Sequence, residues 1–151
     1  MKQINRRDLV IGAAGVAAVA GKSSAQTTDR AAGDFRGGSR VFALSSTPPT
    51  KAANGSQRLV AFSGALATGE VLAAHESWTP AGLPPAPIHT IAHSEVIVVL
   101  EGALTFVHDG REEPAEAGDL IYVAYGTDHA IRNTGKSTAR YLVLQVGGET
   151  K

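Results

Sequence analysis

The sequence contains no cysteine, and this absence removes several kinds of chemistry at once. Disulfide bonds, thiolate metal ligands, a cysteine nucleophile and a lipid anchor on cysteine are all excluded. An excess of charge is also lacking, because 14 lysines and arginines balance 14 aspartates and glutamates. No strong electrostatic field then favours nucleic acid or an anionic membrane, so we expect no nucleic-acid partner.

The sequence also lacks an apolar run long enough to span a bilayer. The clearest run, residues 9–20, has about a dozen residues where a membrane helix needs about 20. It follows a basic start and precedes the small residues 23–25, which is the layout of an export signal over residues 1–25. An ordinary secretory signal and an uncleaved anchor are the alternatives for its type.

Two adjacent arginines favour one class of signal. Arg6 and Arg7 stand directly before the apolar run, and residues 5–10 resemble the twin-arginine export motif, with Asn5 in place of the usual serine or threonine. We therefore expect a periplasmic or otherwise exported protein, with no integral membrane segment after signal removal.

Helical periodicity is missing beyond the signal, while 17 glycines and 7 prolines imply many turns. Short apolar runs, separated by turns every eight to twelve residues, predict an all-β sandwich or barrel of the jelly-roll kind. The expected strands cover residues 41–44, 58–63, 70–78, 96–100, 103–108, 120–123, 129–132 and 140–146. An Asp109-Gly110 pair predicts a type I′ hairpin turn between two of them.

The length of 151 residues suits one domain. After the signal we expect a flexible lead over residues 26–57, whose strand at 41–44 is a candidate edge strand. The barrel follows over residues 58–147, with a tail at 148–151.

Potential ligands are most concentrated between Gly82 and Gly102. His89, His93 and Glu95 lie between a proline-rich approach and the apolar strand at 96–100. His93 and Glu95 are two apart and would share one face of a strand, whereas His89 would be about 20 Å from Glu95 on a straight strand. A bend at residues 90–92 is therefore required, and it would build the site from two adjacent strands. Each of these side chains could equally be an ordinary surface or core residue.

Two further histidines are not included in the candidate site because of their positions in the expected strands. His75 and Trp78 lie on opposite faces of one expected strand, and size favours Trp78 as the core residue and His75 as a residue without function. His108 adjoins the expected hairpin turn and should face solvent.

The joint spacing of two blocks resembles the cupin superfamily. The first cupin block runs from a glycine through a His-x-His pair to a glutamate and a second glycine, matched here by Gly82, His89, Glu95 and Gly102. The second block runs from a glycine to a turn, a histidine and an asparagine, and is matched by Gly118, residues 124–126, His129 and Asn133. The resemblance covers residues 58–146 and implies a cupin double-stranded β-helix, which is a jelly-roll barrel.

The resemblance also implies a metal site. His89, Glu95 and His129 fall on cupin ligand positions, but Ile91 stands where the second histidine is usual, and His93 is the candidate replacement. Imidazole and carboxylate ligands suit a divalent ion such as Fe, Mn, Ni or Zn. The alternative is a cupin that has lost its metal and keeps the fold.

Function is less closely defined than fold, because cupins include dioxygenases, isomerases, lyases, storage proteins and sensing domains. One hypothesis is a metal-dependent enzyme acting on a small molecule, with Tyr122, Tyr125 and Asp128 as candidates for proton transfer. The other is a non-catalytic module that binds a metal or a small-molecule ligand. Cupin barrels often pair through edge strands, so we also expect a homodimer through residues 41–44.

Overall fold

The computed structural model describes residues 38–148, so the export signal expected at 1–25 lies outside the described residues. Within them the chain forms ten strands and one short 3-10 helix. The elements are η2 (Leu44–Ser46), β1 (Thr50–Lys51), β2 (Gln57–Ala65), β3 (Val71–Thr79), β4 (His89–Thr90), β5 (Ser94–Glu101), β6 (Ala103–His108), β7 (Arg111–Glu116), β8 (Leu120–Val123), β9 (Asp128–Asn133) and β10 (Ala139–Val146). No helix in this part of the chain has the length and apolarity needed to cross a membrane.

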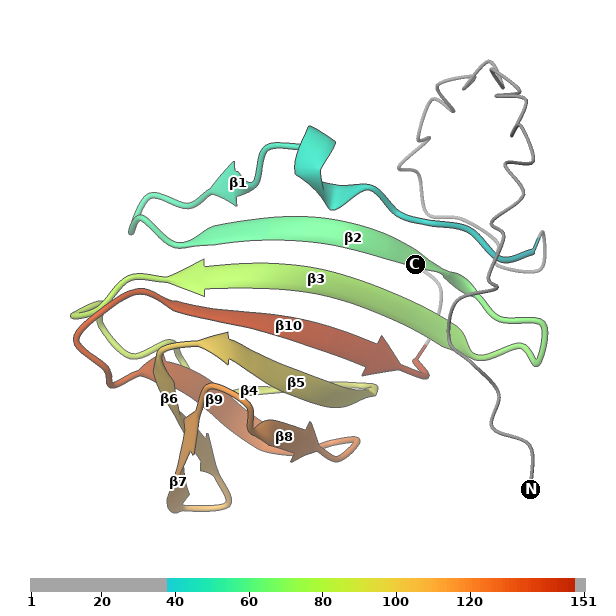
Figure 1. Ribbon diagram of the computed structural model, residues 1–151. Helices are drawn as coiled ribbons and strands as arrows, with labels where there is room; N and C mark the ends of the chain where they lie inside the picture. The colour runs from blue at the N-terminus through green and yellow to red at the C-terminus, as the bar shows by residue number, and fades with distance from the viewer. Residues whose placement is uncertain (1–37, 149–151) are drawn as a thin grey trace, which may run out of the picture.

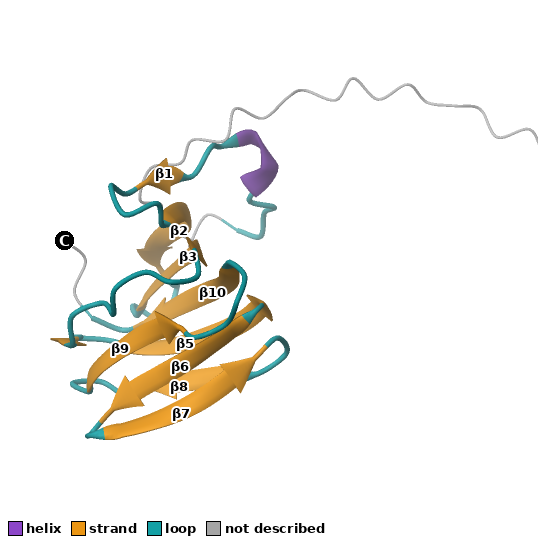
Figure 2. Ribbon diagram, turned by 90° about the vertical axis from the view of Figure 1, so that its left-hand side faces the viewer, coloured by secondary structure: helices purple, strands orange, loops and turns teal. Residues whose placement is uncertain are grey.

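The strands form two sheets in which every neighbouring pair is antiparallel. The larger sheet has the order β1-β2-β3-β10-β5-β8, and the smaller has the order β4-β9-β6-β7. Figure 1 shows the long strands of the larger sheet side by side, and Figure 2 shows β9, β6 and β7 together in front of them. The expectation of an all-β architecture is confirmed.

The core lies between the two sheets and follows from strand alternation. In β5 the side chains of Glu95, Ile97 and Val99 are buried, and the residues between them are less so. Ile97 and Val99 pack with Leu104 and Phe106 of the smaller sheet in one apolar cluster. Since successive side chains of a strand alternate between faces, Glu95 is carried into the same interior as these apolar residues.

Several strand boundaries agree with the sequence prediction. Both β6 and β8 begin and end where the residue pattern placed them, and β5 contains the whole apolar run 96–100. The turn between β6 and β7 has φ values of 46° at Asp109 and 70° at Gly110, as a type I′ turn requires.

The strand expected at residues 41–44 is wrong. No strand forms at 41–43, Leu44 begins the 3-10 helix η2, and the Phe42 ring packs on Phe62 with centroids 4.8 Å apart. The edge of the larger sheet is instead β1, whose two residues pair with β2. The Phe42 ring packs on the sheet and the segment is not a strand, which removes the strand on which the dimer expectation rested.

Candidate functional site

The expected bend after His89 is present, and it joins the two sheets. His89 lies in β4 and pairs with His129 of β9 in the smaller sheet, whereas Glu95 lies in β5 of the larger sheet. The bend between β4 and β5 is held by a backbone hydrogen bond from the Gly126 N–H to the Ile91 carbonyl, 3.0 Å long. Two strands of different sheets thus bring the first and second sequence blocks together.

Glu95 is the centre of the polar cluster inside the barrel. Its Oε1 lies 2.9 Å from Nε2 of His93, and its Oε2 lies 3.9 Å from Nε2 of His129. The Nδ1 of His129 donates to the Thr127 carbonyl at 3.1 Å, which leaves its Nε2 directed toward the carboxylate. The rings of His89 and His129 lie 4.6 Å apart. All four predicted residues are therefore in one neighbourhood, with His129 only 2% exposed and His89 exposed.

Gln145 is a further member of this cluster that the sequence analysis missed. Its amide donates to Oε1 of Glu95 at 3.0 Å, because β10 pairs with β5 and places Gln145 opposite Glu95. Burial alone would raise the pKa of Glu95, but hydrogen bonds from Gln145 and His93 and the charge of His93 lower it below its ordinary value. Glu95 is thus held as a buried carboxylate.

The cluster as arranged does not form a metal centre. Among residues 38–148 no group of three or more histidine, aspartate or glutamate side chains is placed to hold an ion. Ile91, at the position of the missing histidine, is buried in the apolar core, and His93 and Gln145 already occupy one oxygen of Glu95. The chemistry of the donors suits a divalent ion, but their number and present hydrogen bonds do not.

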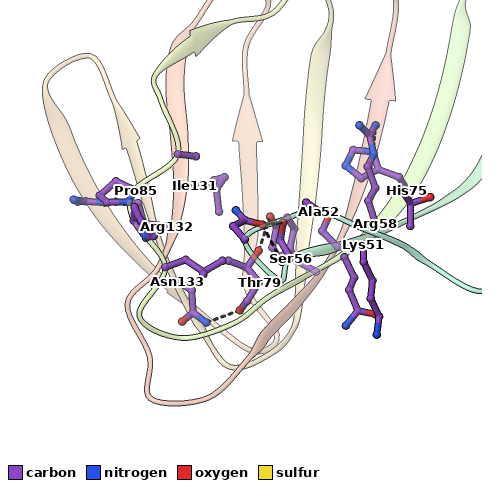
Figure 3. Close-up of a pocket in the computed structure, with 18 of the residues that line it drawn as sticks. Lys51, Ala52, Ser56, Arg58, His75, Thr79, Pro85, Ile131, Arg132 and Asn133 are labelled. Atoms are coloured by element: carbon purple, nitrogen blue, oxygen red, sulfur yellow. Dashed lines mark hydrogen bonds between the residues drawn. The ribbon is translucent and has the colours of Figure 1, made fainter.

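A cavity of about 820 Å³ opens at His75 of β3 and is not lined by a member of this cluster. It lies between the inner face of β2 and β3 and the proline-rich segment 83–87, and Figure 3 shows Pro85 and Ile131 opposite Arg58 and His75. Apolar residues such as Val60, Pro85 and Ile131 line the space together with at least as many polar residues, among them Ser77, Thr79 and Asn133. A volume of this size is typical of small-molecule sites.

His75 lines this cavity, which corrects the expectation for its strand. The two residues do lie on opposite faces, but Trp78 is on the outer face, where the Arg140 guanidinium lies 5.8 Å from its ring, and His75 points inward. The guanidinium of Arg58 donates to Nδ1 of His75 at 3.1 Å. Because arginine has no acceptor, His75 must accept through Nδ1, so its hydrogen is on Nε2.

Burial and the nearby Arg58 charge lower the pKa of His75 from 6.5 to about 4, while Glu95 acts in the opposite direction and His93 in the same one. His75 is therefore neutral at pH 7 in the folded protein.

We expect stability to fall on acidification because of His75. The unfolded chain binds a proton at His75 below pH 6.5 and the folded chain only below about pH 4, so its stabilising contribution is complete above pH 6.5 and is lost between these values. The loss is about 2 kcal/mol, after a discount for the part of the side chain that stays in contact with solvent. Urea unfolding of wild type and His75→Gln between pH 7 and 4.5 measures it, and the variant should show the smaller loss. Equal pH slopes would contradict the assignment.

Four other residues singled out in the sequence make no hydrogen bond or ion pair with Glu95 among the described residues, although His108 stands opposite His129 in the pairing of β6 with β9. Tyr122 and Tyr125 are 65% and 70% exposed, and the Asp128 carboxylate accepts a hydrogen bond from the Thr90 hydroxyl across β4 and β9. His108 is not solvent-facing as expected, since it stacks on Phe106 and hydrogen-bonds Glu113 at 2.8 Å. None of the four reaches Glu95.

Comparison with known proteins supports the same family. Residues 75–145 match the family model described as a cupin domain. No curated protein matches the sequence.

Solved structures with the same fold share little sequence. KdgF from Halomonas sp. has a TM-score of 0.62 and 16% identity, over 73% of this chain and 96% of that one. A predicted oxalate decarboxylase from Thermotoga maritima has a TM-score of 0.60 and 18% identity, over 72% and 100%. An RmlC-like cupin from Shewanella frigidimarina has a TM-score of 0.58 and 21% identity, over 74% and 94%. The fold is the expected cupin jelly roll, and residues 75–145 within it match the model of a cupin domain.

Proposed function

We propose that this protein is an exported cupin that binds a small organic molecule in the cavity between β2, β3 and residues 83–87. The observation that supports it is the cavity itself, about 820 Å³ in volume, with an apolar wall and polar groups directed inward. The buried Glu95 cluster does not line the cavity, but the charge of Glu95 acts on His75, which does. The proposal requires no chemical step, so it covers both a binding module and the binding stage of an enzyme.

A cavity-filling substitution tests this proposal. Val60 lines the cavity and is 52% exposed, so Val60→Trp should place the indole in the open space while the strand tolerates an aromatic residue. A thermal-shift screen of small organic compounds of mixed charge should find ligands for wild type, and at 100 times Kd each should add about 2.7 kcal/mol of stability. Val60→Trp should lose the effect.

The matched control is Val41→Trp, which makes the same change at a residue that is 87% exposed and does not line the cavity. This variant should keep the ligand-induced stabilisation. Compounds that stabilise Val60→Trp as strongly as wild type would locate the binding elsewhere and contradict the proposal.

A second candidate function adds a divalent ion at His89, Glu95 and His129. It is favoured by the Nε2 of His129, which faces Oε2 of Glu95 at 3.9 Å while Nδ1 is fixed on the Thr127 carbonyl. Such backbone support of the second nitrogen is usual for histidine ligands. To take this position an ion of the Fe, Mn, Ni or Zn class must compete with the hydrogen bonds of His93 and Gln145 to Glu95. The hypothesis of a metal-dependent enzyme depends on this ion.

Metal analysis of protein purified without chelators tests the second candidate. A stoichiometric divalent metal that is lost in both His129→Ala and Glu95→Ala, but kept in His108→Ala, is the expected result for a site at these residues. His93→Ala should reduce the metal content only if His93 replaces the ligand missing at Ile91. Metal that is unaffected by His129→Ala and Glu95→Ala rejects the site, and metal-free wild type favours the binding module.

Export through the twin-arginine route completes the proposal. Its support is the pair Arg6 and Arg7 directly before a short apolar run. Changing both arginines to lysine keeps the charge, and we expect the full-length protein then to stay in the cytoplasm, as measured by cell fractionation. Unchanged export of the lysine variant would indicate an ordinary secretory signal.

A further inference from the structure

The lining of the cavity carries charge of only one sign. Lys51, Arg58 and Arg132 are among its lining residues, and none of the described residues that line it is acidic. Figure 3 shows Lys51 and Arg58 on one side of the space, beside His75, and Arg132 on the other. A cavity lined by one sign of charge concentrates ligands of the opposite sign.

Two of these cations lack a carboxylate partner. Among residues 38–148 neither Lys51 nor Arg58 is within ion-pair distance of an aspartate or glutamate. The recorded side-chain partner of Arg58 is Nδ1 of His75, at 3.1 Å. This ring nitrogen must be an acceptor, because guanidinium only donates, and an imidazole that accepts through Nδ1 carries no positive charge. The guanidinium is thereby oriented by a group that does not neutralise it.

Arg132, the third cation, has partners for only some of its hydrogen-bond donors. Arg132 forms an ion pair with Glu112 through one terminal nitrogen, at 2.5 Å, while its Nε is buried and has no hydrogen-bond partner. A buried donor without a partner is unusual in a folded protein.

The cavity also has apolar lining residues. They include Val60, Leu83, Pro85 and Ile131. The complementary ligand is therefore an organic body of modest size that carries an anionic oxygen group.

We propose that the cavity selects small organic carboxylates, with the carboxylate bound by Arg58 and assisted by Lys51. This proposal rests on the proposed function, because it specifies the chemical class of the molecule that the same cavity binds. Arginine is suited to this role because its planar pair of N–H donors matches the two oxygens of a carboxylate.

Pairs of acids and their neutral amides test the proposal. Isothermal titration calorimetry of the mature protein is carried out with propionate, succinate, benzoate and phenylacetate, each beside its amide of nearly the same shape. At least one acid should bind about tenfold tighter than its amide, since a charge-assisted hydrogen bond is about twice as strong as a neutral one. In Arg58→Gln this preference should disappear, while the glutamine keeps a donor for His75.

Two controls separate the possible causes. Arg111→Gln makes the same change of charge at an exposed residue of β7 outside the cavity, and it should keep the preference. Val60→Trp should abolish binding of acid and amide alike.

If amides bind as tightly as acids and Val60→Trp abolishes both, the cavity function stands and the carboxylate selection is overturned. If no compound binds, or if Val60→Trp has no effect, both proposals fail. An acid preference that persists in Arg58→Gln overturns the role of Arg58.

Discussion

Replacing Gly102 with alanine is expected to lower the free energy of unfolding by about 3 kcal/mol, combining left-handed backbone strain with overpacking. Gly102 has φ of 78°, and a Cβ there would lie 3.0 Å from the Ala139 Cα and 3.2 Å from the Thr138 carbonyl oxygen. Ala139 is fully buried and begins β10, the strand at the centre of the larger sheet, so neither backbone atom can move without disturbing the core. Equilibrium unfolding in urea measures the loss.

Gly82→Ala separates the two causes. Gly82 has φ of 75°, almost the same as Gly102, but a Cβ there meets no atom within 4 Å. This variant should lose only about 1 kcal/mol, the cost of the backbone conformation alone. Equal losses in the two variants would contradict the close approach of the β5–β6 turn to β10. The two glycines that open and close the first sequence block thus have different physical roles.

Replacing Ile91 with histidine is expected to produce the largest change in metal binding. Ile91 stands at the ligand position that the cupin pattern assigns to histidine, and the Gly126 N–H holds its backbone in the bend before β5. A histidine here would give a set of three imidazoles and one carboxylate. We expect affinity for Zn²⁺ or Ni²⁺ to rise by about 100-fold, which corresponds to about 2.7 kcal/mol.

The metal-free variant should be less stable than wild type by about 2 kcal/mol, because a polar ring replaces an apolar core side chain. Added metal should reverse this loss, and thermal unfolding with and without Zn²⁺ measures both effects. Ile91→Gln places a polar side chain of similar length at the same site and should show the loss without the metal-dependent recovery. A histidine variant that fails to recover with metal would show that residue 91 is not directed toward Glu95 and His129.

The strands were predictable wherever local pattern and turn chemistry agreed. Strands β6 and β8 have apolar alternation bounded by glycine or aspartate turns, and their limits were correct. The segment 41–44 has a similar apolar content but binds through the Phe42 ring on Phe62, a contact that sequence pattern does not contain. β7 was not predicted because its sequence has no apolar run. Glu112, Glu113 and Pro114 lie in this edge strand, whose surface is mostly polar.

In the candidate site, too, residues within the sequence motifs were predicted, and residues placed by strand pairing were not. Spacing predicted that His89, His93, Glu95 and His129 would meet, because the turn pattern returns the second block to the first. Gln145 joins them only through the pairing of β10 with β5, and His75 faces the cavity only because of the face on which β3 packs. The cations Lys51 and Arg58 had no motif at all. Their proposed role in ligand binding rests on the absence of carboxylates around them in the cavity. This depends on the tertiary structure and cannot be read from the sequence.

The location of ligand binding is the central claim, and amide chemical shifts recorded during titration test it most directly. In ¹⁵N-labelled protein titrated with the acids used above, the account predicts shifts concentrated in β1, β2, β3 and residues 83–87, with little change in β7. The Nε resonance of Arg58 should also move, as its guanidinium binds the carboxylate. Saturable shifts confined to β7, β8 or other residues away from the cavity, or an absence of shifts at millimolar acid, would contradict the account.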